Sequence, residues 1–170
     1  MGFFSNLFSS IPILSGIGKN KNQKSTVELQ YDKAMNLLGN ANTQEAVEVL
    51  EGISDIGIND STYKQFGLDA LKILSELYET GKYSEAKVEI DLNKAAGYLE
   101  KYTNQTNEPE MIYKTAKKYM QAQNFSKAVS FFEKATVAGI KAAYMNLGNI
   151  YENGLNRIDE HGNKSEFVVP

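Results

Sequence analysis

Apolar residues in this chain recur every three to four positions, which is the spacing of one face of an α-helix. Between residues 27 and 153 this pattern divides into separate stretches, most of them bounded by short polar segments or by glycine. The predicted helices span residues 27–40, 43–56, 61–80, 91–103, 108–122, 125–138 and 141–153. No segment requires a β-strand, so the sequence predicts an all-α fold.

Capping residues and glycines support these boundaries. A polar residue followed three positions later by Glu, the spacing of a capping box, occurs at Asn42 with Glu45 and at Asn107 with Glu110. Asp91 precedes another predicted helix and can accept hydrogen bonds from its first amides. Glycine, which favours helix ends, stands near four predicted termini: Gly57, Gly81, Gly139 and Gly154.

The chain also contains an internal repeat. Residues 46–58 align without a gap with residues 128–140, and a third copy of the core begins at Ala95, one period before the copy that begins at Ala128. The string Leu-Tyr-Glu-Thr-Gly at 77–81 returns two periods later as Ile-Tyr-Glu-Asn-Gly at 150–154. The period is close to the value of about 34 residues that is typical of repeated helix-turn-helix units. We therefore expect a repeating unit of two antiparallel helices.

The residues of this unit resemble a known repeat family. Small and aromatic residues follow the order of the tetratricopeptide repeat at Ala116, Tyr119, Ala128, Phe132 and Ala135. The segments 147–154 and 77–81, the latter followed after a long loop by Asp91 and Lys94-Ala95, look like the Sel-one-like variant. The resemblance covers about residues 27–154. It implies an all-α fold, a right-handed α-solenoid of antiparallel helix hairpins with about 3.5 repeats.

The resemblance also implies a function. Solenoids of this family bind a protein or peptide on the concave face, so the chain is expected to be an interaction module (an adaptor, holder or inhibitor) without a cofactor. The positions carried over from the family pattern combine Tyr and Met with charged residues. They are Tyr31, Met35, Asp69, Lys72, Glu76, Tyr113, Lys117, Met120, Met145 and Asn149.

Composition and motifs argue against other classes of function. The net charge is −3 and no basic stripe is present, which disfavours nucleic acid as a partner. Cysteine is absent, so thiolate metal sites and disulfides are excluded. The single histidine, His161, lacks ligand spacing, and Gly16–Lys19 fails as a phosphate loop because Ile13 and Asn20 replace required residues. We expect neither catalysis nor a bound metal.

The amino-terminal part forms a separate region. Residues 1–18 carry an apolar stripe that begins with Phe3, Phe4, Leu7 and Phe8, residues 19–26 form a polar linker, residues 27–154 the repeat domain, and residues 155–170 a tail or incomplete repeat. The stripe could cover the first repeat, dock on a membrane surface or a partner, or act as an atypical export signal. A cytoplasmic location is expected, with membrane attachment as the alternative.

At the carboxyl end the last helix lacks a second helix of its hairpin. An uncovered apolar flank is expected there, formed by Tyr144, Leu147, Ile150 and Tyr151. Three explanations remain open at this point. Residues 167–169 fold back over the flank, a second molecule covers it through self-association, or the chain is part of a longer repeat array.

Overall fold

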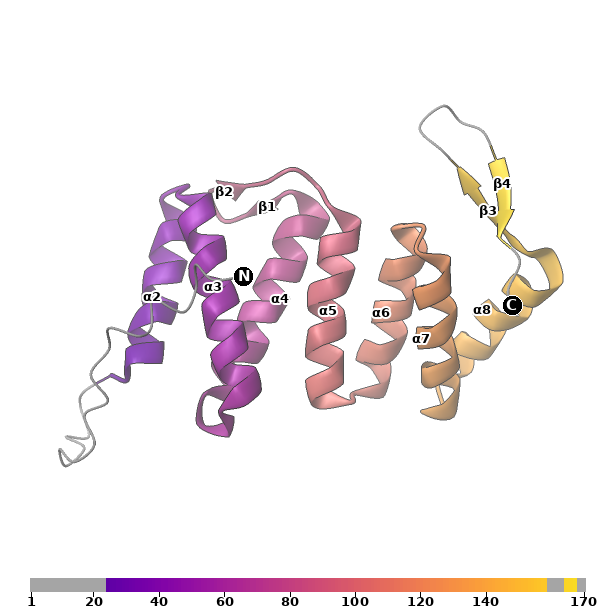
Figure 1. Cartoon of the computed structure of the whole chain (residues 1–170), viewed down its shortest axis with the longest axis horizontal. Helices are drawn as coiled ribbons and strands as arrows, with labels where there is room; N and C mark the ends of the chain where they lie inside the picture. The colour runs from indigo at the N-terminus through magenta and orange to yellow at the C-terminus, as the bar shows by residue number, and fades with distance from the viewer. Residues whose placement is uncertain (1–23, 159–163, 168–170) are drawn as a thin grey trace.

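The computed structural model describes residues 24–158 and 164–167, which form seven sequential α-helices and two short β-hairpins. The helices are α2 (Thr26–Gly39), α3 (Thr43–Asn59), α4 (Lys64–Thr80), α5 (Leu92–Thr106), α6 (Pro109–Gln121), α7 (Phe125–Val137) and α8 (Lys141–Asn153), with a 3₁₀ helix η1 (Ser61–Tyr63) before α4. Each helix packs mainly against its neighbours in sequence, so that they lie side by side (Figure 1). The predicted all-α helical body is confirmed.

The expectation that no strand occurs is wrong at two places. The antiparallel hairpin of β1 (Lys82–Tyr83) and β2 (Ala86–Lys87) lies in the predicted loop between α4 and α5, and β3 (Leu155–Ile158) pairs with β4 (Lys164–Phe167) after α8. The strands of the first hairpin have two residues each and those of the second have four, so they give little or no periodic signal for pattern analysis. Ala86 is completely buried in the helical core, which holds the first hairpin against the helices.

Some predicted caps differ from those observed. Asp91 caps α5 as expected, and its side chain accepts from the Lys94 amide at 2.9 Å. Asn42 is the N-cap of α3 but its side chain makes no capping bond, and Asn107 ends α5 in a left-handed conformation (φ 52°) rather than starting α6. The capping box that does form, Ser25 with Glu28 at the start of α2, was not among those predicted.

Of the four glycines expected at helix ends, one has another role. Gly81 and Gly154 are the C-caps of α4 and α8, and Gly139 follows α7 with φ 87°. Gly57 instead lies inside α3 and faces Gly67 of α4. A Cβ at position 57 would lie 2.6 Å from the Gly67 Cα, so this glycine permits a close helix crossing and does not end the helix.

The turns α2–α3, α6–α7 and α7–α8 share one backbone conformation. In each, a single left-handed residue follows the helix, at Ala41 (φ 60°), Gln123 (φ 55°) and Gly139 (φ 87°). The next amide then donates to the carbonyl five residues earlier: Asn42 to Leu37 (2.9 Å), Asn124 to Tyr119 (2.9 Å) and Ile140 to Ala135 (3.0 Å). This is a Schellman motif whose last residue also begins the next helix. The sequence repeat is therefore accompanied by a repeat of backbone geometry.

These turns support a prediction about stability. Ala41 adopts a left-handed conformation that costs a non-glycine residue about 1 kcal/mol. Ala41→Gly is expected to raise the free energy of unfolding by about 0.5 kcal/mol, because glycine's larger unfolded-state entropy offsets part of the gain. Gly139→Ala should lower it by about 1 kcal/mol through backbone strain alone, since no atom lies within 4 Å of the added Cβ. Urea denaturation measures both changes, and two changes of the same sign would contradict this interpretation.

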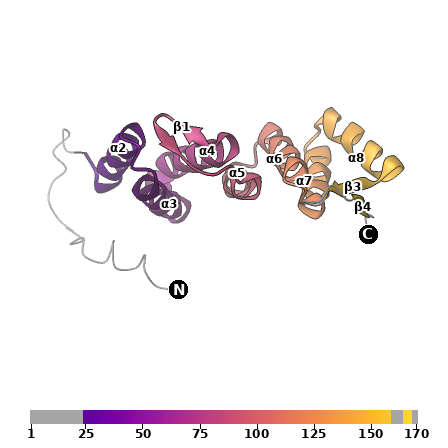
Figure 2. The same cartoon turned by 90° about the horizontal axis from the view of Figure 1, so that it is seen from above.

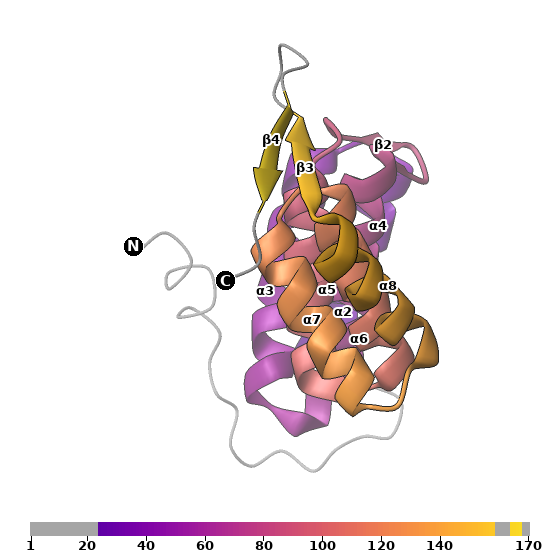
Figure 3. The same ribbon diagram turned by 90° about the vertical axis from the view of Figure 1, so that its right-hand side faces the viewer.

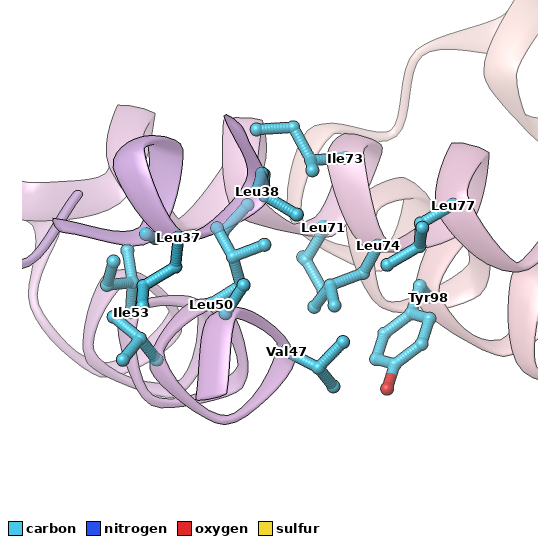
Figure 4. Close-up of a cluster of buried hydrophobic side chains, with 14 of the residues drawn as sticks. Leu37, Leu38, Val47, Leu50, Ile53, Leu71, Ile73, Leu74, Leu77 and Tyr98 are labelled. Carbon is cyan, nitrogen blue, oxygen red and sulfur yellow. The ribbon is translucent and has the colours of Figure 1, made fainter. Parts of the chain in front are cut away.

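The core consists of two apolar clusters that meet at α5. One contains residues from α2 to α5 (Figure 4), and the other is formed by α6, α7 and α8 with Ala96 of α5. Positions that match in the sequence repeat are buried alike. Ala46, Ala95 and Ala128 are 0% exposed, and the residues four positions later, Leu50, Leu99 and Phe132, are at most 2% exposed.

A glutamate directly follows each of these bulky residues, and all three glutamates make the same kind of contact. Glu51, Glu100 and Glu133 each accept a hydrogen bond from a tyrosine hydroxyl of another helix: Tyr98 (2.5 Å), Tyr119 and Tyr151 (3.2 Å), respectively. Burial, and then the bond to Glu51, raises the pKa of Tyr98 well above its usual value. These neutral hydroxyls act as permanent donors that tie neighbouring helices together.

The expected apolar flank of α8 is only partly observed. Ile150 is 4% exposed and packs with Leu147 in the second cluster, so its assignment to the flank is wrong. Tyr144 and Tyr151 are exposed as expected. The backbone of Phe167 pairs with Leu155 in the β3–β4 hairpin, and residues 168–170 lie outside the described residues.

Candidate protein-binding surface

The helices alternate between two rows when the molecule is seen from above (Figure 2). Helices α2, α4, α6 and α8 lie on one side and α3, α5 and α7 on the other. All ten residues predicted to bind a partner lie on the first row, which we call the even-helix row. Five of them are exposed there: Lys72, Glu76, Lys117, Met145 and Asn149.

The other five predicted residues are half-buried and partly serve the core. Tyr31 and Met35 of α2 pack against the first cluster, and the Tyr31 ring meets the Phe66 ring edge-on at 5.4 Å. Met120 of α6 packs against the second cluster. Asp69 accepts a hydrogen bond from Gln65 at 3.0 Å on its own helix. These side chains therefore contribute less free surface than the sequence pattern predicts.

Tyr113, the remaining half-buried residue, lies at the best-defined part of the row. Its ring packs 5.8 Å from the Phe132 ring, and its hydroxyl accepts a hydrogen bond from the Asn146 side chain at 3.1 Å. The Lys117 amine lies 5.8 Å from the centre of the Tyr113 ring, within reach of a cation–π interaction. Contacts from α7 and α8 thus hold the ring in place beside a lysine that remains exposed.

Tyr113 and Lys117 line a hollow of about 350 Å³ on α6. The other lining residues, not predicted from the sequence, are Glu110, Met111, Lys114, Lys118 and Gln121. Most of them stand three or four positions from a predicted residue on the same helix, and this spacing is the signal that could have identified them. The hollow combines an aromatic ring and aliphatic stems with amine, amide and carboxylate groups, which suits a polypeptide better than an apolar ligand.

An ion pair fixes the distance between the two central helices of the row. Lys118 of α6 contacts Glu79 of α4, and their side chains are 9% and 34% exposed. Burial lowers the pKa of the Lys118 amine below its ordinary value. Elsewhere on α4, the Lys72 amine lies 4.7 Å from the centre of the Tyr102 ring of α5. Lysines of both helices are thereby held at defined positions rather than left to sample many rotamers.

A larger hollow, about 720 Å³, lies outside the predicted site. It is bounded by the segment before α5, by the first residues of that helix and by the α6–α7 turn. Its lining residues include Tyr78, Val88 and Ile90, and Ile90 is exposed. None of the predicted binding residues takes part in it.

One partly buried polar cluster combines a lysine, a tyrosine and a glutamate. Lys127 donates to Glu100 at 2.7 Å and to the Tyr119 hydroxyl at 3.2 Å, while that hydroxyl donates to Glu100. Burial, and then the bond to Glu100, raises the pKa of Tyr119 to about 12, so the phenol keeps its proton. Burial alone would raise the pKa of Glu100, but bonds from Lys127 and Tyr119 lower it. The cluster connects α5, α6 and α7.

Other predicted features lie wholly or partly outside the described residues. His161, the Gly16–Lys19 loop and the stripe of Phe3, Phe4, Leu7 and Phe8 are among them, so membrane attachment stays a prediction. Within residues 24–158 and 164–167, no group of three His, Cys, Asp or Glu side chains is placed to hold a metal ion. None of the helices in this part of the chain is long and apolar enough to cross a bilayer.

Comparison of the chain with models of protein families, with characterised proteins and with solved structures finds no match. The internal repeat and the geometry of the even-helix row are therefore the observations from which a function can be inferred.

Proposed function

We propose that this chain is a protein–protein interaction module whose even-helix row binds a protein or peptide segment. The helices would form a right-handed solenoid of the tetratricopeptide or Sel-one-like type, as the sequence resemblance implies. Three turns of one conformation, equally buried alanines and sequential packing of neighbouring helices support this proposal. Stacked hairpins bury their apolar sides against one another and leave a row of side chains free for a partner.

The observation that carries the proposal is the hollow on α6. Tyr113 is fixed by Phe132 and Asn146, and Lys117 stands exposed beside it. A tyrosine held by its neighbours loses little conformational entropy on binding, which is why such residues often dominate the affinity of an interface. Glu76, Lys72 and Asn149 extend the surface along the row with both charge signs. A polypeptide with apolar and acidic side chains fits this chemistry.

The double change Tyr113→Ala and Lys117→Ala is expected to weaken partner binding by about tenfold or more, because it removes the aromatic anchor and its neighbouring cation. Partners captured from the native cell extract are identified by mass spectrometry, and each dissociation constant is then measured by calorimetry with the purified partner. Circular dichroism verifies that the variant remains helical.

A matched control tests whether the even-helix row matters. Lys134 of α7 also lies over an aromatic ring, with its amine 4.5 Å from the centre of Phe131, but it belongs to the opposite row. Lys134→Ala should leave binding unchanged. If the control weakens binding as much as the double change, or if the double change has no effect on any partner, the proposed site is wrong.

A further inference from the structure

The outer flank of α8, the last helix of the even-helix row, is a second surface formed by residues other than the ten predicted to bind a partner. Helix α8 packs against α7, and no other described helix lies beyond it (Figures 1 and 3). Two tyrosines on this flank, Tyr144 and Tyr151, are 59% and 56% exposed. Gly148 stands between them, and an added Cβ there would meet no atom within 4 Å. The flank is thus a shallow apolar surface with an open centre.

Helix α4 shows how the chain itself covers such a flank. The repeated string that links 77–81 with 150–154 aligns α8 with α4 without a gap. In this alignment Leu71 matches Tyr144, Ser75 matches Gly148 and Tyr78 matches Tyr151. Leu71 is completely buried and Ser75 is 5% exposed, whereas their counterparts in α8 are open to solvent or half-buried. The difference is that α5 packs on α4.

The order of elements after the two helices is also the same. A C-cap glycine with positive φ, Gly81 or Gly154, ends each helix, and a two-stranded antiparallel hairpin follows. After β1–β2 the chain continues into α5, which returns along α4 (Figure 1). Within the described residues no helix takes this place on α8. The arrangement at α4 therefore indicates that a helix of the α5 kind fits α8.

The contacts of α5 specify what such a helix must carry. Its Lys94 amine lies 4.8 Å from the centre of the Tyr78 ring. The next residue, Ala95, is completely buried, and its carbonyl accepts from the Ser75 hydroxyl at 2.9 Å. Helix α7 repeats the arrangement on α6, where Lys127 precedes the buried alanine and its amine lies 4.9 Å from the Tyr119 ring. In both helix pairs, α4 with α5 and α6 with α7, a lysine lies over a tyrosine ring of the preceding helix and the alanine that follows it is completely buried.

The charges at α8 complete the comparison. Tyr151 donates to Glu133 as Tyr119 donates to Glu100, and these glutamates occupy matching positions of the repeat. The Glu100 carboxylate also forms an ion pair with the Lys127 amine at 2.7 Å, whereas no described lysine forms an ion pair with Glu133. Glu133 and Tyr151 are therefore exposed side by side, whereas the corresponding pair, Glu100 and Tyr119, is contacted by the Lys127 amine.

From these observations we propose that the outer flank of α8 docks an amphipathic helix of a partner protein in which a lysine directly precedes an alanine. The lysine would lie over Tyr151 and pair with Glu133, and the alanine would contact Gly148. A second copy of this chain is a poor source of such a helix. The chain has five lysine-alanine pairs, and the alanines of four of them are completely buried in its own core: Ala34, Ala95, Ala128 and Ala135. The fifth pair, Lys141-Ala142, begins α8 itself. The central residues of the docking surface, Tyr144, Gly148 and Tyr151, are not among the ten residues predicted to bind a partner on the even-helix row.

The test uses the full chain and a synthetic peptide with the sequence of residues 91–106, which contains the required lysine-alanine pair. We expect a dissociation constant on the order of 100 µM, since a short isolated helix must be ordered when it binds. Amide chemical shifts of the labelled chain should change in α8 and the end of α7. Replacing Lys94 of the peptide, the lysine that precedes the alanine, by glutamate should weaken binding about fivefold or more.

Three variants of the chain make the test specific. Gly148→Leu should leave the free chain folded, since the position is open, but should abolish docking by blocking the close approach. Tyr151→Ala should weaken docking about fivefold. Leu29→Ala is the control, because Leu29 is an exposed apolar side chain of α2, at the opposite end of the helical body from α8. Its affinity for the peptide should be unchanged.

Several results would overturn the proposal. One is the absence of binding at millimolar peptide. Another is a set of shift changes centred on α4, which would mean that the peptide displaces α5 rather than docking on α8. A third is concentration-dependent dimerisation of the chain that Gly148→Leu removes, because a second copy would then be the occupant.

Discussion

Replacing Gly57 by alanine is expected to lower the free energy of unfolding by about 3 kcal/mol, because the added methyl group would overlap backbone atoms that cannot rotate away. The Cβ would lie 2.6 Å from the Gly67 Cα, 2.8 Å from its nitrogen and 2.9 Å from the Tyr63 carbonyl oxygen. Relief requires α3 and α4 to separate, and separation would open the first apolar cluster between Ile53 and Leu71. Chemical denaturation monitored by circular dichroism measures the loss.

The matched control is the same substitution at Gly97 in the middle of α5. An alanine Cβ there would meet no atom within 4 Å, so only the intrinsic helix preference changes. Alanine is favoured over glycine inside a helix by about 1 kcal/mol, and Gly97→Ala should therefore stabilise the chain. The same substitution is therefore expected to lower the free energy of unfolding at Gly57 and to raise it at Gly97. A Gly57→Ala variant as stable as the natural chain would show that the helix crossing tolerates a side chain.

This pair of glycines illustrates what sequence analysis could predict and what it could not. The apolar spacing located all seven described helices, because each buries one face along its length. The same analysis assigned Gly57 to a helix end, since the repeat aligns it with Gly139. Only the three-dimensional crossing distinguishes the two glycines, because Gly139 has φ 87° while Gly57 continues α3 toward Gly67. A local pattern does not reveal which neighbour a helix face meets.

The proposed binding surface remains a prediction, but the positions of its residues can be compared with the fold. The ten residues that the family resemblance predicted all belong to helices of one row, and five are exposed. Tyr31 and Met35 are half-buried because α2 packs on α3 and α4, where the Tyr31 ring meets the Phe66 ring. The sequence pattern of α2 alone does not contain this contact. Lys118 could not be predicted as buried, since its partner Glu79 lies on another helix that is distant in the chain.

The boundary between the two apolar clusters differs from their interiors. Where α5 meets α6, the buried hydroxyls of Thr103 and Thr115 lie 2.8 Å apart, and the Lys118–Glu79 pair bridges α6 to α4 nearby. Hydrogen bonds of this kind contribute about 1 kcal/mol each, less than burial of one large apolar side chain. We therefore expect the two halves of the helical body to separate more readily than the helices within each half.

This difference leads to the prediction of largest expected effect. Phe132 is 1% exposed in the second cluster and contacts the Tyr113 ring, so Phe132→Ala should cost about 4 kcal/mol through lost burial and the cavity left behind. Because Phe132 belongs to the second cluster, the loss should be concentrated in α6, α7 and α8. Amide hydrogen exchange followed by mass spectrometry should show faster exchange there, with α2, α3 and α4 nearly unchanged.

Leu50→Ala is the complementary experiment in the first cluster. Leu50 aligns with Phe132 in the sequence repeat and is completely buried. Its loss should cost about 3 kcal/mol and accelerate exchange in α2, α3 and α4 instead. The combined variant should show both regional effects added together, because residues in separate clusters have no shared contacts through which to couple. If either single change accelerates exchange equally along all seven helices, the chain unfolds as one cooperative unit and the polar boundary at α5 and α6 does not divide it.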